Sequence, residues 1–143
     1  MKTAVSVASI LERERDSTIK EWLKRVNLVT ELTNIPLNDV NRTGHLPKLF
    51  DDLVARLRRG RDAHPIISIA AAAHGNVRFQ QGYSASMLVE ESRIFQVSTF
   101  STLHLHQSEL DQSEVLLDVI TIADEADRQL TETVRSFMTA RAA

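Results

Sequence analysis

Glycine and proline are scarce in this chain, which has only four glycines and three prolines among its 143 residues. Few such residues mean few turns, because glycine supplies positive φ and proline fixes φ near −65°. Strict alternation of apolar and polar residues, the pattern of a half-buried strand, does not extend beyond a few positions. The sequence therefore predicts an all-α protein, a helical bundle of about five helices with a four-helix-bundle or globin-like core.

Composition indicates one folded domain over residues 1–143. The hydrophobic fraction is 43%, the charged fraction is 25% and the net charge is −2. This balance gives no basis for nucleic-acid binding through bulk electrostatics. The absence of cysteine excludes disulfides and thiol chemistry. The longest apolar run, residues 66–73, is far short of the roughly 20 residues of a membrane span. With no signal peptide apparent, we expect a cytoplasmic protein without a membrane partner.

Helical periodicity and end signals divide the chain into five expected helices. They cover residues 6–32, 46–59, 65–81 and 84–106, and a last helix from 108 or 111 to the end. The first has a polar interruption at residues 12–17, so we expect its N-terminal dozen residues to extend beyond the domain body, with Trp22 as a core anchor. The third is apolar all round up to His74, which predicts a helix buried in the middle of the fold.

The last expected helix carries a heptad-like seam at spacings of three and four. An apolar seam of this kind must be covered, and the sequence has no glycine or proline to end the helix before Ala143. We expect a parallel homodimer in which this long helix carries a signal outward. The dimer and output seam is assigned to Leu116, Val119, Ala123, Ala126, Leu130 and Phe137.

A helical hairpin is expected around Gly82. The glycine is a natural C-terminal stop, and the Ser84 hydroxyl can cap the next helix. Arg78 lies about one turn before this stop, and Glu91 lies about two turns after the restart. The sequence therefore predicts that these two side chains meet across the hairpin as an ion pair.

The five histidines do not form a recognisable metal motif. His104 and His106 are two residues apart, so on a helix they point in directions about 200° apart and cannot share one metal ion. His74 follows four alanines and is expected to be shielded from solvent. We expect no metal and no cofactor, and no motif of an enzyme active site is present.

Several segments together resemble the N-terminal domain family of RsbRD-type stressosome co-antagonists, which also occurs at the front of bacterial sensor histidine kinases. The resemblance lies in His74-Gly75, Arg78, Gln81-Gly82-Tyr83-Ser84, Leu88-Val89 and Glu91-x-Arg93, with weaker matches at Trp22-Leu23 and at His45-Leu46-Pro47 with Leu49 and Leu53. Ser92 departs from the aromatic residue that the family tends to carry.

The resemblance implies a non-catalytic signal-input domain. Its implied partners are a second copy and a downstream kinase or STAS-type output domain. The candidate sensing residues are His74, Arg78, Tyr83 and Glu91. Two alternatives remain open. One is a histidine phosphotransfer protein that uses His74, although the lysine expected three residues later is missing. The other is a globin-like cofactor-binding sensor.

Overall fold

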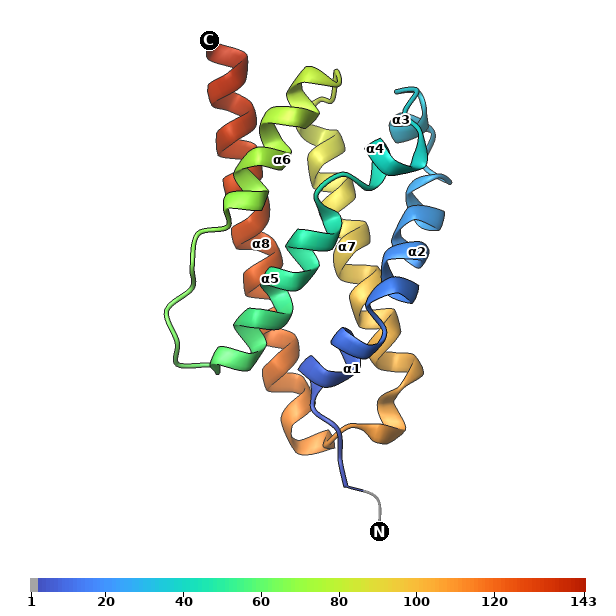
Figure 1. Cartoon of the computed structure of the whole chain (residues 1–143), viewed down its shortest axis with the longest axis vertical. Coiled ribbons are helices and arrows are strands. Elements are labelled where there is room, and N and C mark those ends of the chain that lie inside the picture. The colour runs from blue at the N-terminus through green and yellow to red at the C-terminus, as the bar shows by residue number, and fades with distance from the viewer. Residues whose placement is uncertain (1–2) are drawn as a thin grey trace.

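The computed structural model describes residues 3–143 and confirms the all-α bundle (Figure 1). Within those residues the only bridge of β type is an isolated pair between Val5 and Leu110. None of the helices described combines the length and the apolarity that a membrane crossing requires. The elements in chain order are α1 (Val7–Arg13), α2 (Arg15–Val26), α3 (Thr30–Thr33), α4 (Asp39–Thr43), α5 (Leu46–Arg59), α6 (Ile69–Gln80), α7 (Ala85–Leu105), the 3-10 turn η1 (Gln107–Glu109) and α8 (Gln112–Ala142).

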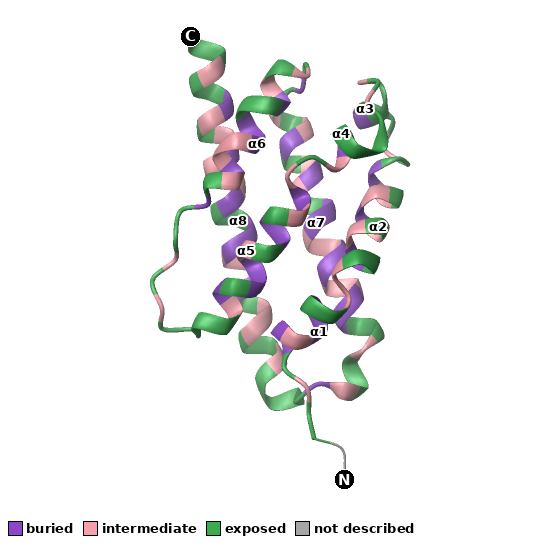
Figure 2. Cartoon of the chain, viewed as in Figure 1, coloured by how far each residue is buried: buried purple, intermediate pink, exposed green. Residues whose placement is uncertain are grey.

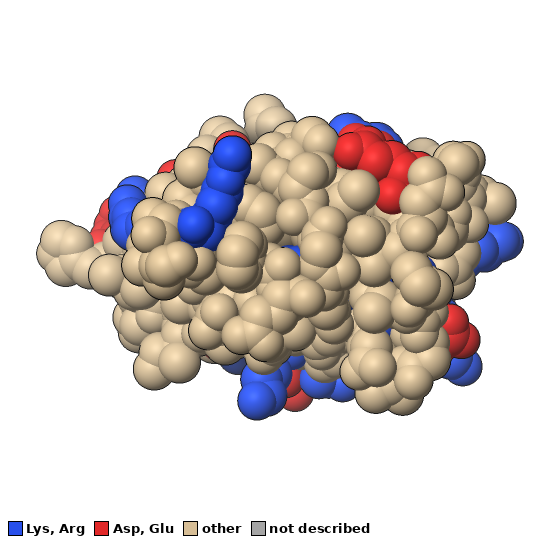
Figure 3. All heavy atoms as spheres, turned by 90° about the horizontal axis from the view of Figure 1, so that it is seen from above, with Lys and Arg blue, Asp and Glu red and all other residues tan. Residues whose placement is uncertain are grey.

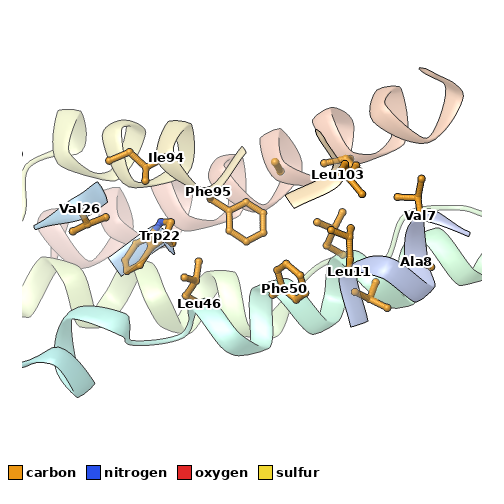
Figure 4. Close-up of a cluster of buried hydrophobic side chains, with 14 of the residues drawn as sticks. Val7, Ala8, Leu11, Trp22, Val26, Leu46, Phe50, Ile94, Phe95 and Leu103 are labelled. Carbon is orange, nitrogen blue, oxygen red and sulfur yellow. The ribbon is translucent and has the colours of Figure 1, made fainter. Parts of the chain in front are cut away.

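The two longest helices, α7 and α8, pack against each other and form the frame of the bundle. Helix α6 packs mainly on α8, while α2 packs on α7. Helix α5 contacts α8, and α1 crosses one end of the bundle against α5 and α7 (Figure 1). The space between these helices holds one apolar core (Figure 4), whose members include Val7, Leu11, Trp22, Val26, Leu46, Phe50, Ile94, Phe95 and Leu103.

The expected helix over residues 6–32 is wrong as a single element. The chain breaks at Glu14 into α1 and α2, and α2 ends at Val26. The polar residues at the break pair with distant elements, because Arg13 contacts Glu109 and Arg15 contacts Asp51. Residues 7–13 therefore do not extend beyond the domain, and their apolar side is buried against α5 and α7. Trp22 is buried in the core, as expected.

The expected helix over residues 65–81 begins later, at Ile69. Ser68 is its N-cap, accepting a hydrogen bond from the Ala71 amide at 3.0 Å and donating one to Asp52 at 2.7 Å. The prediction that this helix is buried on all sides is wrong, because α6 is covered mainly by α8. Its outer face and the irregular segment before it remain exposed (Figure 2).

Helices α6 and α8 approach each other closely at Gly75. A Cβ atom at this glycine would lie 2.1 Å from the Thr133 carbonyl oxygen. The Thr133 hydroxyl donates to the Ala71 carbonyl at 3.1 Å, one turn away. Phe79 and Phe137 then meet edge to face, with ring centroids 5.6 Å apart. The small residues of α6 thus allow α8 to pack closely against the hairpin of α6 and α7.

The residues of the expected seam on α8 divide between the core and the surface. Ala126 and Phe137 are buried and belong to the core of this chain instead of forming a contact surface, because α6 and α7 cover that side of α8. Leu130 packs against the same core, and Val119 and Ala123 are half-buried. Leu116 is exposed. The seam therefore serves mainly to attach α8 to the bundle.

Candidate functional site

The hairpin between α6 and α7 brings Arg78 and Glu91 together inside the protein. Gly82 adopts φ of 89°, and the Ser84 hydroxyl caps α7 by accepting from the Met87 amide. Arg78 donates from Nη2 to Glu91 Oε2 at 2.9 Å and from Nε to Oε1 at 3.1 Å. This two-point geometry is the strong form of an arginine–carboxylate contact. The predicted ion pair is confirmed.

Glu91 also contacts the two other residues that the sequence marks as candidates. His74 Nε2 lies 3.2 Å from Glu91 Oε1, and the Tyr83 hydroxyl donates to Oε2 at 3.0 Å. Arg78, Glu91, Tyr83 and His74 are all buried, and Arg78 has no exposed surface. We refer to these four residues as the Glu91 network.

Arg78 fastens the network to a third part of the chain. Its Nη1 donates to the Asn41 carbonyl at 2.9 Å and to Gln81 Oε1 at 2.7 Å, and its Nη2 also donates to the Arg42 carbonyl. With the two bonds to Glu91, all five N–H donors of the guanidinium are used. Arg78 therefore holds α4 against the hairpin and has no donor left for a ligand.

The charges in the network follow from these contacts. Burial by itself would raise the pKa of Glu91, but the hydrogen bond from His74 and the charge of Arg78 outweigh it and hold that pKa below its usual value. Burial, and then the charge of Glu91, raises the pKa of Tyr83 to about 12. At neutral pH, Glu91 is thus an anion that accepts hydrogen bonds, and Tyr83 is a neutral donor.

His45, at the start of α5, contacts the network; the resemblance included this residue, but the sequence predicted no role for it in the site. Its ring lies edge to face with that of His74, with centroids 5.6 Å apart. Both Nδ1 atoms are buried, and neither has a hydrogen-bond partner in the part of the chain described. Burial, followed by the nearby His74, Lys48 and Arg78, lowers the pKa of His45. No local spacing links residues 45 and 74, because tertiary packing alone brings them together.

A small cavity adjoins the network and extends to α8. Its volume is about 40 Å³, which is enough for at least one water molecule. His74 and Glu91 line one side, Gln129 and Thr133 of α8 contribute further polar atoms, and the remaining wall is apolar. The cavity can therefore accept a small polar guest in contact with both the network and α8.

A second buried polar group lies between α5 and α8, and it too was missed. Gln129 donates to the Leu49 carbonyl at 2.9 Å and to Glu125 at 2.8 Å. Arg56 pairs with Asp124 at 2.6 Å and lies 3.5 Å from Glu125. Burial raises the pKa of Glu125, against the opposing effects of Gln129 and Arg56. The only sign of this group in the sequence was a set of polar residues four apart, Glu125, Gln129 and Thr133, on the side of the last helix that also carries Ala126.

The lowered pKa of His45 predicts a dependence of stability on pH. The folded chain binds a proton at His45 less readily than the unfolded chain, whose histidine pKa is about 6.5. This contribution to the free energy of unfolding is fully present above about pH 6.5 and is lost progressively as the pH falls below it. The urea concentration at the unfolding midpoint should therefore fall as the pH is lowered from 7.5 to 5.5. The fall should be smaller in His45→Gln, while exposed His104→Gln should keep the full fall.

Neither a metal-binding group in the described part of the chain nor a known relative marks this site. Among residues 3–143, no group of three or more His, Cys, Asp or Glu side chains is placed to hold a metal ion. Comparisons with protein-family models, with curated protein sequences and with solved structures found no match. The fold and the site thus place this protein in a structural class, the all-α bundles, and add a buried ionic network where its helices meet.

Proposed function

We propose that this chain is a non-catalytic signal-input domain of a bacterial signalling protein of the sensor histidine kinase or stressosome type. The resemblance to the RsbRD-type N-terminal family supports this role, because its matching residues His74, Arg78, Tyr83 and Glu91 are the four that form one buried network. In this proposal the domain is cytoplasmic, works as a homodimer and passes its state to a kinase or STAS-type output domain.

The proposal rests on the position of the Glu91 network beside a small cavity that residues of α8 also line. All four side chains of the network are buried, so its charges act within the protein on the elements packed around them. The adjoining cavity contacts Gln129 and Thr133 of the long terminal helix. A change in the occupancy or protonation of the network would alter the packing of α8, which is the route by which a bundle can transmit a signal.

The proposal is tested by joining the chain through α8, in continuous helical register, to the dimerisation and catalytic parts of a histidine kinase. Autophosphorylation should rise and fall with a helical period as one to four residues are inserted after Ala143. His74→Gln should shift the activity of the uninterrupted fusion, whereas exposed His104→Gln should not. Activity that is insensitive to the insertions and to His74→Gln would contradict a signal-input role.

The competing phosphotransfer function predicts a reactive His74, and we expect it to be unreactive. The ring is buried, and Nε2 faces the Glu91 carboxylate, which would repel an incoming phosphoryl group. Incubation with acetyl phosphate or with a phosphorylated response regulator should leave the protein unlabelled. Label that is present on the chain and lost in His74→Gln would favour the phosphotransfer function instead.

A further inference from the structure

Three isoleucines stand exposed on the segment that leads into α6. Ile66, Ile67 and Ile69 are 64%, 70% and 84% exposed, and we refer to them as the isoleucine ridge. Single exposed apolar residues are common, but a contiguous group of large ones is typical of an interaction surface. The segment lies along one side of the bundle, beside α8 (Figures 1 and 2). No element of the described chain covers it.

A groove runs along each side of the isoleucine ridge. One, of about 350 Å³, is lined by Ile66 and Ile67 together with Lys48, Asp51 and Arg59. The other, of about 320 Å³, is lined by the same isoleucines with residues of α8 that include Arg128, Glu132 and Arg135. The surface therefore combines a projecting apolar ridge with hollows that can receive a ridge of similar size.

The apolar surface continues onto the outer face of α6. Val77 is exposed there and Ala73 is half-exposed. Residues 63–77 contain no lysine, arginine, aspartate or glutamate. Charged residues lie instead at the outer edges of the two grooves, and each edge carries both signs. An apolar centre with a polar rim is the usual anatomy of a protein interface.

We propose that the occupant of this surface is a second copy of the same chain, bound through a twofold axis. In such an isologous contact one patch must serve as both projection and recess, and the isoleucine ridge with its two grooves meets this requirement. When the rim of one copy faces the same rim of the other, a cation can lie opposite an anion, because each rim carries residues of both signs. Ala70 and Ala73 allow the two α6 helices to approach closely.

The exposed apolar group on α8 fits a second copy less well. Leu116, Leu117 and Ile120 are exposed, and residues 112–127 contain five acidic residues and no lysine or arginine. The acidic residues are largely paired within the chain, because Arg61 contacts Glu114 and Asp118 while Arg56 contacts Asp124. None of the three apolar residues lines either groove beside the isoleucine ridge, so the argument from a projection and its recess does not extend to this face. Ile120, at 59% exposed, is therefore a matched control for Ile67. This inference refines the homodimer of the proposed function by naming its surface.

Sedimentation equilibrium over a range of concentrations tests the surface. The unmodified chain should dimerise, Ile67→Asp should weaken the dimer by at least about tenfold in Kd, and Ile120→Asp should leave Kd unchanged. Far-ultraviolet circular dichroism should be the same for all three proteins, because both isoleucines are exposed. A chain that stays monomeric at high micromolar concentration overturns the inference, and so does a dimer lost in Ile120→Asp but kept in Ile67→Asp.

Single-cysteine crosslinking gives a second readout, since the natural chain has no cysteine. Under oxidising conditions Ile67→Cys should form a disulfide-linked dimer efficiently, and Ile120→Cys should not. Equal crosslinking at both positions would also contradict the surface. The outcome is separable from the fusion experiment. A monomer in which His74→Gln still shifts kinase output would remove the homodimer and its surface but leave the signal-input role. A ridge dimer with unresponsive output would remove the signal-input role but leave the surface.

Discussion

Glu91→Gln is expected to lower the free energy of unfolding by about 3–5 kcal/mol, because it removes one partner of a buried ion pair and leaves the other charge uncompensated. Arg78 has no exposed surface and directs two of its donors at this carboxylate. The neutral amide of glutamine keeps the size of the side chain, but it has a single oxygen to accept hydrogen bonds where glutamate has two. Urea denaturation, evaluated by linear extrapolation, measures the loss.

The neighbouring residue supplies the control for this substitution. Glu90 pairs with Arg93 near the surface of α7, so Glu90→Gln should cost no more than about 1 kcal/mol. The double variant Arg78→Met with Glu91→Leu should lose less stability than the sum of the two single variants, since neither charge is then left unpaired. A loss below about 1 kcal/mol for Glu91→Gln would show that the pair is not buried as described.

Gly75→Ala should be destabilising by about 1–3 kcal/mol, even though alanine is the better helix former by about 1 kcal/mol. The added Cβ would lie 2.1 Å from the Thr133 carbonyl oxygen and 3.1 Å from the Phe137 amide nitrogen. These are backbone atoms, so the clash is relieved only if α6 and α8 move apart. Thermal and urea unfolding should both show the loss.

Asn76→Ala, on the same helix, is expected to change stability in the opposite direction. Asn76 is exposed, so the substitution should raise stability slightly, by up to about 0.7 kcal/mol, through helix propensity alone. If Gly75→Ala instead behaved like Asn76→Ala, the close approach of α6 to α8 would not exist. The adjoining cavity would then not be shared between the Glu91 network and α8.

Short-range signals in the sequence predicted much of the fold. The hairpin stop at Gly82 and the cap at Ser84 are local signals, and each is observed. Of the two starts left open for the last helix, 108 and 111, the structure has the second, with Asp111 as the N-cap. The expected helix over residues 84–106 agrees closely with Ala85–Leu105. The meeting of Arg78 with Glu91 was predictable for the same reason, because a single tight turn fixes their relative positions.

The errors arise where tertiary contacts decide the outcome. The break at Glu14 leaves helical periodicity on both sides, and the contacts of Arg13 with Glu109 and of Arg15 with Asp51 that accompany it exist only in the folded chain. The apolar composition of residues 66–73 predicted a buried segment, yet Ile66, Ile67 and Ile69 are exposed, because composition alone does not say which side of a segment the fold covers. Likewise His45 and Gln129 reach the site from α5 and α8, and no spacing along the chain links them to Glu91.

The Glu91 network and α8 are expected to be coupled through the cavity that they share. Hydrogen–deuterium exchange resolved by peptide tests this coupling most directly, with His74→Gln compared against exposed His104→Gln. We predict that His74→Gln speeds the exchange of α8 amides around Gln129 and Thr133 by roughly tenfold or more, while α1 amides keep their rates. Unchanged α8 rates, or an equal increase over the whole chain, would contradict the coupling.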